Sequence, residues 1–326
     1  MKKLLLAASL AMAVVGVFAL PAGARPPGSN GRIAYDRTDP ATGDGAVFTA
    51  NPDGGQERQL VANSCCPGWS HDGSKLSAPY LTDDGRIGTA TVNADGSGYA
   101  PLPINDSTLN VACAGGAWSP DDSQLACESW DESNPARNGI YTMSSADGSN
   151  LTRLTNPGVG GDDQPGAYSP DNKRLVFGRF DANGDGVGLF VIKTNGTGLR
   201  EITPPGTLIQ GGNDGDWSPQ GNRIVFSRHV TPDVRGSIWV VDSDGSGLHE
   251  IQVQGFACGG SVFDANGFGC HEPHWSPDGT KIIFAANSPA TGTNIYTVNV
   301  DGTGHRQVTF DGNDDDPVWG THPLIP

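Results

Sequence analysis

Acidic residues, joined by one histidine, gather immediately before four regularly spaced aromatic residues of this chain. Clustered carboxylates concentrate a negative electrostatic field, which attracts a metal cation or a basic segment of a partner. We therefore predict a binding site that is formed by Asp163, Asp214, Asp216, His271, Glu272, Asp315 and Asp316. The alternative interpretation is that these residues are solvated acids of ordinary surface loops.

A second group of oxygen-bearing side chains resembles the opening of a calcium-binding loop. Asp181, Asn183 and Asp185 alternate along the chain, and Gly186 follows them. Calcium prefers such oxygen ligands. The twelfth position of a calcium loop normally supplies a bidentate acid, but here it is Ile192. The alternative interpretation is a hairpin turn, because Asn, Asp and Gly are the usual turn formers.

A third group, around His271, combines residue types that bind zinc. Cys270, Glu272 and His274 surround it in the sequence. On a strand, side chains three positions apart point to opposite faces, so we expect the imidazoles of His271 and His274 to diverge. We also expect Cys270 to belong to a disulfide. The sequence therefore does not favour a zinc site.

The elements that must position these residues are the strands of a sequence repeat. An aromatic residue begins each unit, and the intervals between units run from 44 to 58 residues. The six aromatic residues are Trp69, Trp118, Tyr168, Trp217, Trp275 and Trp319. Repeats of this size are typical of solenoids and propellers. We interpret the aromatic side chains themselves as core packing rather than as ligand contacts.

The clearest copy of the unit contains four short strands and two kinds of turn. Its first turn, Ser276–Gly279, has Pro and Gly where a tight reversal needs them. Its second turn is an Asp-Gly or Asn-Gly pair, which tolerates the positive dihedral angles of short hairpins. Copies of that pair occur at Asp53-Gly54, Asp95-Gly96, Asp147-Gly148, Asn195-Gly196, Asp244-Gly245 and Asp301-Gly302.

The unit that contains the first Asp-Gly turn, Asp53-Gly54, has no aromatic residue at its beginning. Conversely, the last aromatic residue, Trp319, is not followed by the remaining strands of a unit. Gly31–Tyr35 corresponds to a second strand, and Pro317–Trp319 can supply the first strand that it lacks. We therefore predict an all-β fold over residues 25–326: a six-bladed β-propeller of four-stranded blades, closed by a C-terminal strand that joins the N-terminal blade. A linear stack would instead need capping repeats.

The first residues are typical of an export signal. Lys2 and Lys3 precede the apolar stretch Leu4–Leu20, and Ala22–Ala24 offers a small-residue cleavage site. We expect a signal peptide at residues 1–24, a periplasmic or secreted protein, and no membrane insertion after cleavage. Cleavage removes two lysines and takes the formal net charge from −16 to −18. Such a surface disfavours nucleic acid as a partner.

Six cysteines in an exported chain favour disulfides. We predict a bridge between Cys258 and Cys270, because both lie in the insertion that lengthens one repeat. Cys113 and Cys127 are expected to lie opposite each other on neighbouring strands of one blade. Two alternatives remain for the adjacent pair Cys65-Cys66: a bridge between the two, or bridges to the cysteines of the next blade.

The Trp-Ser-Pro-Asp-Gly phrase at 275–279, the Ile-Tyr phrase at 295–296 and the Asp-Gly turns resemble the TolB-type, WD40-like propeller family over residues 30–322. The resemblance implies an exported six-bladed scaffold that binds partners over one face or at the mouth of its channel. We expect no counterpart of the N-terminal α/β domain of TolB, because the segment before the first strand is short. The Gly-x-Ser-x-Gly elbow of serine-hydrolase relatives does not occur in the sequence.

The leading hypothesis is a monomeric, non-catalytic binding scaffold of the cell envelope or exterior, whose acidic channel mouth engages a protein or a glycan. The alternative is a carbohydrate-active enzyme such as a polysaccharide lyase, assisted by calcium, the one cofactor that the sequence suggests. A lyase needs a base near a uronate carboxylate and a cation that stabilises the developing charge. The side chains available for that chemistry are His271, His274, Arg228 and His229.

Overall fold

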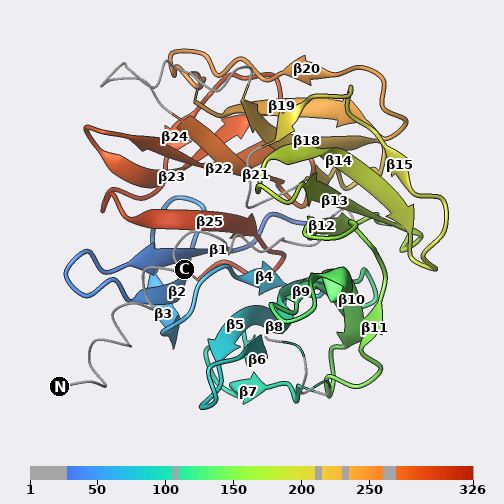
Figure 1. The fold of residues 1–326 in the computed structure, drawn as a ribbon. Helices are drawn as coiled ribbons and strands as arrows, with labels where there is room; N and C mark the ends of the chain where they lie inside the picture. Colours follow the sequence, from blue (N-terminus) through green and yellow to red (C-terminus); the bar gives the residue numbers. More distant parts are fainter. Residues whose placement is uncertain are drawn as a thin grey trace.

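A computed structural model describes residues 28–104, 106, 109, 111–209, 215–229, 235–259 and 269–325. The expected signal peptide, residues 1–24, and one residue of the predicted site, Asp214, lie outside these ranges. Among the described residues, no helix combines the length and the apolar character needed to cross a membrane. The structure is built almost entirely of short antiparallel strands (Figure 1).

The chain forms six blades, and each blade has an innermost strand that ends at one of the six repeated aromatic residues. The innermost strands are β25 (Asp314–Trp319), β4 (Gly68–Trp69), β8 (Val111–Trp118), β12 (Asp162–Tyr168), β17 (Asp216–Trp217) and β21 (Gly269–Trp275). The second strands are β1 (Ile33–Thr38), β5 (Lys75–Leu81), β9 (Gln124–Trp130), β13 (Arg174–Phe180), β18 (Arg223–His229) and β22 (Lys281–Ser288).

The two outer strands of each blade continue the same antiparallel order. The third strands are β2 (Gly45–Ala50), β6 (Ile87–Asn93), β10 (Gly139–Ser144), β14 (Gly186–Lys193), β19 (Ser237–Asp242) and β23 (Gly292–Asn299). The outermost strands are β3 (Arg58–Ala62), β7 (Ala100–Pro101), β11 (Thr152–Arg153), β15 (Arg200–Glu201), β20 (His249–Glu250) and β24 (Arg306–Gln307). A further short strand, β16 (Leu208–Ile209), pairs with the end of β18, and a 3₁₀ turn, η1, spans Pro135–Arg137.

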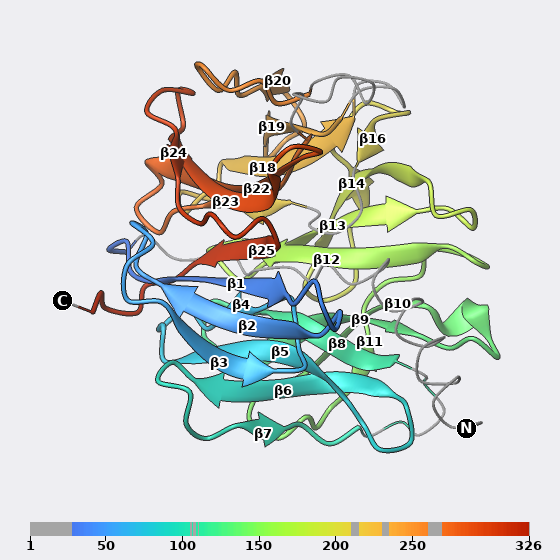
Figure 2. The same cartoon turned by 90° about the vertical axis from the view of Figure 1, so that its left-hand side faces the viewer.

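The innermost strands form a closed ring, and Figure 2 shows where it closes, with β25 from the C-terminal end beside β1 from the N-terminal end. Each contacts the next, from β25 to β4, β8, β12, β17 and β21, and β21 in turn contacts β25. The blade that closes the ring has the strand order β25, β1, β2, β3, so it joins both ends of the chain. The predicted six-bladed fold and its closure are therefore confirmed.

The closing strand is held by backbone pairing on both sides of one irregularity and by its aromatic residue. Trp319 lies opposite Ile33, and the indole N–H of Trp319 donates to the carbonyl oxygen of Gly31 at 3.0 Å. The backbone N–H of Arg32 donates to His322 at 2.8 Å, which extends the pairing beyond the strand. Because backbone donors and acceptors buried without partners are costly, this ladder fixes the register of closure.

The repeated aromatic side chains are core residues, as the sequence predicts. All six are at most 3% exposed. Trp217 shows the arrangement: it packs with Ile224 of its own blade and with Val176 and Leu189 of the preceding blade. Burial of such large rings between neighbouring blades is a main source of stability in this fold.

All six cysteines are paired. The predicted bridge Cys258–Cys270 is present, and Cys113 pairs with Cys127 across neighbouring strands β8 and β9. Of the two alternatives for the adjacent cysteines, the structure has the bridge between Cys65 and Cys66 themselves. Cys66 has a positive φ of 55°, which is uncommon for a residue with a side chain.

Removing the closing strand tests the ring. We expect deletion of 317–326 to lower the melting temperature by more than about 10 °C or to abolish cooperative unfolding, because loss of a buried Trp alone costs about 3–5 kcal/mol. Deletion of 323–326 is the matched control, since it keeps the pairing through His322. Calorimetry and near-ultraviolet circular dichroism measure both. A cooperative, wild-type-like transition in the longer deletion would contradict ring closure by β25.

Candidate functional site

The residues three and four positions before the repeated aromatic residues lie toward one end of the propeller channel, and in two innermost strands the pairing is irregular there. In β21 the pairing with β22 shifts between His271 and His274, and in the closing blade the pairing of β1 with β25 shifts between Ala34 and Asp36. Glu272 and Asp316 sit at these irregularities with φ values of 51° and 48°. Bulges of this kind redirect side chains, and strained residues of this kind concentrate at functional sites.

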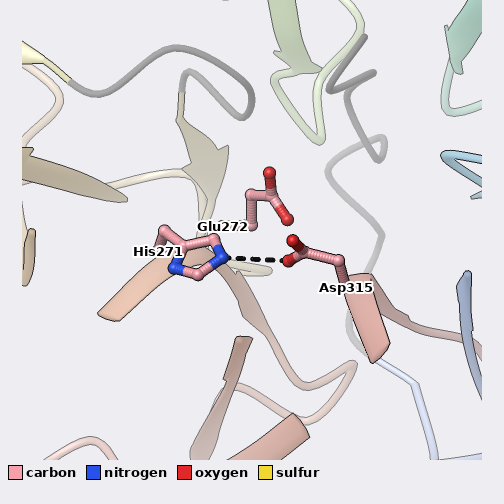
Figure 3. Close-up of side chains that lie close together, drawn as sticks. All are labelled: His271, Glu272 and Asp315. Carbon is pink, nitrogen blue, oxygen red and sulfur yellow. Dashed lines mark hydrogen bonds and ion pairs between the residues drawn. The ribbon is translucent and has the colours of Figure 1, made fainter. Parts of the chain in front are cut away.

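Five side chains meet at this end of the channel, and we call them the mouth cluster: Asp36, His271, Glu272, Asp315 and Asp316. Nε2 of His271 lies 3.0 Å from Oδ1 of Asp315 (Figure 3). The possible ligand atoms of His271, Glu272 and Asp315 all lie within 4.8 Å of one another. Figure 3 shows the three side chains directed toward one another from neighbouring blades.

The remaining two carboxylates complete the mouth cluster from the closing blade. The backbone N–H of Asp316 donates to Oε2 of Glu272 at 2.9 Å, which ties β25 to β21. Asp36 lies opposite Asp315 in the ladder between β1 and β25, and its carboxyl group is close enough to that of Asp316 for their charges to interact. The sequence analysis missed Asp36. The feature of the sequence that could have indicated Asp36 is its position as an acidic residue directly after the apolar run Ile33–Tyr35.

The mouth cluster is buried except on one side. Asp36, His271, Glu272 and Asp316 are 6–7% exposed, whereas the side chain of Asp315 is 40% exposed. Within the described part of the chain, Oδ1 of Asp36 and Oδ1 of Asp316 are buried without a hydrogen-bond partner. Buried acceptors without donors are uncommon in folded proteins and call for a ligand, a proton or water.

Burial and mutual repulsion change the protonation of the mouth cluster. Burial, reinforced by the charges of Asp315 and Asp316, raises the pKa of Glu272 well above its usual range. Burial and the charge of Asp36 do the same to the pKa of Asp316. Burial and the charge of Asp315 raise the pKa of Asp36 to about 7. These three carboxyl groups therefore hold protons more tightly than free acids do.

The pair His271 and Asp315 behaves in the opposite way. Burial disfavours the charged imidazole, but the Asp315 carboxylate outweighs burial and raises the pKa of His271 to about 9. Burial likewise opposes the charge of Asp315, but His271 outweighs it and lowers the pKa of Asp315. At neutral pH His271 is thus a cation bonded to Asp315. A metal ion that uses its nitrogen must first displace that proton.

Two other predicted site residues lie elsewhere. Asp163 is fully buried and accepts from Nε of Arg179 at 2.6 Å, across β12 and β13. The pair Asp314 and Arg37 repeats this contact across β25 and β1 at 2.5 Å. Such cross-strand ion pairs hold the inner strand to the second strand. The structure therefore gives Asp163 a partner within its own blade rather than in the mouth cluster.

Asp216 connects two blades. Its Oδ2 accepts the backbone N–H of Trp275 at 2.8 Å and lies 3.5 Å from Nδ1 of His274. His271 and His274 thus contact opposite neighbours, Asp315 in one blade and Asp216 in the other. The expected divergence of the two imidazoles is present, although a bulge lies between them.

The calcium-like loop has the hydrogen bonds of a hairpin turn. Oδ1 of Asp181 accepts the backbone N–H groups of Asn183 at 2.8 Å and Asp185 at 3.1 Å. These bonds lower the pKa of Asp181. Ile192, at the twelfth position, is a buried strand residue. Turn formation accounts for the side chains of this loop, and calcium binding there stays a prediction.

Comparison with known proteins places the fold in a family. The profile of the TolB beta propeller domain matches residues 29–322. Among solved structures, TolB from Acinetobacter baumannii is similar, with 18% identity and a TM-score of 0.66, over 89% of this chain and 66% of that one. A putative TolB from Agrobacterium tumefaciens has 18% identity and a TM-score of 0.61, over 86% of this chain and 90% of that one.

The same fold also occurs within an enzyme. A puromycin-hydrolyzing peptidase from Mycobacterium tuberculosis has 13% identity and a TM-score of 0.56, over 88% of this chain but only 46% of that one. At such low identity the structural likeness shows the fold and leaves the activity to the site. The family profile, in contrast, spans nearly all of the described residues, and the chain therefore belongs to the TolB beta propeller domain family.

Proposed function

We propose that the protein is an exported, non-catalytic binding propeller whose mouth cluster receives a cationic group. That group is a basic side chain on a segment of a protein partner, and a calcium ion competes for the same place. The three disulfides support a location outside the reducing cytoplasm. The observation that carries the proposal is the excess of buried carboxylates over cations at one end of the channel.

The charges of the mouth cluster are unbalanced in the protein alone. Four carboxyl groups face a single imidazolium, His271, and carboxylate oxygens of Asp36 and Asp316 are left without a donor. Burying unpaired charge is expensive, so the cluster is satisfied by protons or by a cation. Asp315, the exposed member, gives an incoming group access from the solvent.

The lyase alternative receives less support from the geometry. Its basic residues do not converge: His271 is bonded to Asp315, and His274 lies beside Asp216 in another blade. The guanidinium of Arg228 lies 4.5 Å from the centre of the Trp239 ring, within its own blade. A base and a cation must both reach one substrate for proton abstraction, and these side chains are held by different partners.

Protons and cations should compete for the mouth cluster. Because the pKa values of Asp36, Glu272 and Asp316 are raised by folding, the folded protein holds protons that the unfolded chain releases, so stability falls as pH rises through about 7. His271 acts in the same direction: its contribution is complete below its unfolded pKa and is lost as pH rises through about 9.

We therefore expect the cation-free protein to melt at a lower temperature at about pH 8 than at about pH 6. Calcium at about 100 times its Kd should add about 2.7 kcal/mol of stability at the higher pH, or about 4 °C for a chain of this size, and much less at the lower pH. Differential scanning calorimetry with and without calcium measures both effects.

Variants in which a carboxyl group is replaced by an amide test where the calcium ion binds. The double variant Glu272→Gln and Asp316→Asn keeps side-chain shape and relieves repulsion, so it should fold normally and lose the calcium shift. The matched control Asp181→Asn changes an exposed acid of the hairpin loop and should keep the shift. If Asp181→Asn loses it and the double variant keeps it, calcium binds the loop and this assignment is wrong.

Partner binding is tested by capture from cell-envelope extract. Wild-type mature protein and the Asp181→Asn control should cross-link to the same protein. The double variant should capture about tenfold less of that protein, which corresponds to a loss of about 1.4 kcal/mol in binding free energy. A basic peptide taken from the captured protein should compete, and calcium should weaken the capture.

Two results would contradict the proposal. Equal capture by the double variant would show that the partner binds elsewhere. Formation of unsaturated products from acidic polysaccharides, followed by ultraviolet absorbance and lost in a His271→Gln variant, would show catalysis at this site.

A further inference from the structure

The vicinal bridge Cys65–Cys66 occupies, in the second blade, the position along the chain that residues of the mouth cluster occupy in the closing blade and in the blade of β21. Three pairs of adjacent residues have the same spacing from the aromatic residue that ends an innermost strand: the first member lies four positions before it and the second member three positions before it. The pairs are Cys65-Cys66, His271-Glu272 and Asp315-Asp316. The second member of each pair has nearly the same backbone angle, with φ values of 55°, 51° and 48°. The bridge is therefore part of the same channel rim, one blade beyond Asp316.

This part of the rim lacks the sheet pairing that the other two pairs have. The innermost strand β4 contains only Gly68 and Trp69, and its pairing with β5 stops at Ser77. Pro67 and Pro79 lie on either side of the missing ladder, and proline has no N–H to donate. The disulfide thus takes the place of backbone hydrogen bonds in fixing the rim of this blade.

The segment around the bridge also contacts the preceding blade, where the backbone N–H of Ser64 donates to the carbonyl oxygen of Gly45 at 3.1 Å. The hydroxyl of Ser64 donates to the carbonyl oxygen of Pro79 at 2.6 Å. Cys66 packs against Ala114 of the next blade, together with Ile87 and Trp130. The bridge joins adjacent residues and closes a small covalent ring, so the conformation of the peptide between Cys65 and Cys66 depends on it.

Solvent reaches this bridge more readily than the bridge in the neighbouring blade. Cys65 is partly exposed, whereas Cys113 and Cys127 are both fully buried. Cys258 is partly exposed like Cys65, and the partners Cys270 and Cys66 are both buried, but Cys270 lies within the strand β21 whereas Cys66 precedes the short strand β4. Thiol exchange requires access of a thiolate to a sulfur atom, which favours attack at Cys65.

We propose that Cys65–Cys66 is a redox modification site, reduced by a dithiol, and that its reduction weakens the binding of a cationic group at the mouth cluster. A thiolate of the dithiol attacks Sγ of Cys65, forms a mixed disulfide and releases the Cys66 thiolate, which takes a proton. The second thiol of the reagent then displaces Cys65 as a thiol. Two electrons and two protons pass to the protein, and the dithiol leaves as a disulfide.

The bridge and part of the mouth cluster lie in adjacent blades. β4 contacts β25, the strand that carries Asp315 and Asp316. Opening of the bridge removes the covalent ring that constrains the peptide between Cys65 and Cys66, in the blade next to the one that carries Asp316. The binding effect rests on the proposed function, but the selective reduction of the bridge does not.

The experiment treats folded mature protein with increasing dithiothreitol, then blocks free thiols with iodoacetamide and identifies the labelled cysteines by peptide mass spectrometry. Label should appear on Cys65 and Cys66 before any other cysteine. Isothermal titration with calcium alone should then show a Kd raised by about 5- to 150-fold, the usual size of coupling between two sites, and reoxidation should restore it.

Two double variants test whether the change in calcium affinity comes from the Cys65–Cys66 bridge or from another disulfide. Cys65→Ser with Cys66→Ser should bind calcium as weakly as the reduced protein and should not respond to dithiothreitol. Cys258→Ser with Cys270→Ser should keep the response. Circular dichroism checks that each variant is folded.

The outcomes distinguish this inference from the proposed function. Label on Cys258 and Cys270 first, or no label on Cys65 and Cys66 before unfolding, overturns the modification site. Selective label with unchanged calcium affinity overturns the coupling and leaves the proposed function intact. If oxidised protein binds no calcium, the proposed function and the coupling both fail, and the labelling order alone decides the modification site.

Discussion

The pairing of β25 with β1 is the constraint on which the rest of this structure depends. It joins residues from the two ends of the chain in one blade and leaves no innermost strand without a neighbour on each side. The pairing also explains why the site lies where it does. Asp36 comes from the N-terminal strand, Asp315 and Asp316 come from the C-terminal strand, and His271 and Glu272 come from the blade beside them. An open chain would have the same residues but would not bring them together.

At this point of the ring, the residues that would best stabilise closure differ from the residues that are present. A closing blade built only for stability would place apolar side chains along its inner strand, as Ala114 and Ala117 do in the third blade. Here the closing strand brings three consecutive acids, of which Asp314 is neutralised by Arg37 and the other two are directed to the channel. Buried like charges reduce stability, so their presence at the seam supports the proposed binding role.

The sequence was sufficient for the fold because the fold is repeated in it. Six aromatic residues and six Asp-Gly or Asn-Gly turns report the same unit independently, and local turn chemistry determines each hairpin. The site was only partly predictable. His271, Glu272, Asp315 and Asp316 do meet, but Asp163 and Asp216 are held by Arg179 and by the next blade. Which acids reach the channel depends on bulges and on cross-strand partners, and neither follows from spacing along the chain. Asp36 was missed because it belongs to a second strand, whose residues usually pack rather than line a channel.

Ring closure brings together the carboxyl groups that we propose take up a cation. Anomalous diffraction tests this directly: crystals of the mature protein at about pH 8, where the raised carboxyl pKa values favour ion uptake, are soaked in a strontium or lanthanide salt. The account predicts an anomalous peak bounded by Asp36, Glu272 and Asp316, with the His271 imidazole still bonded to Asp315. A mouth cluster without a peak, with its carboxyl groups joined to one another by shared protons while the ion binds at the Asp181 loop, would contradict it.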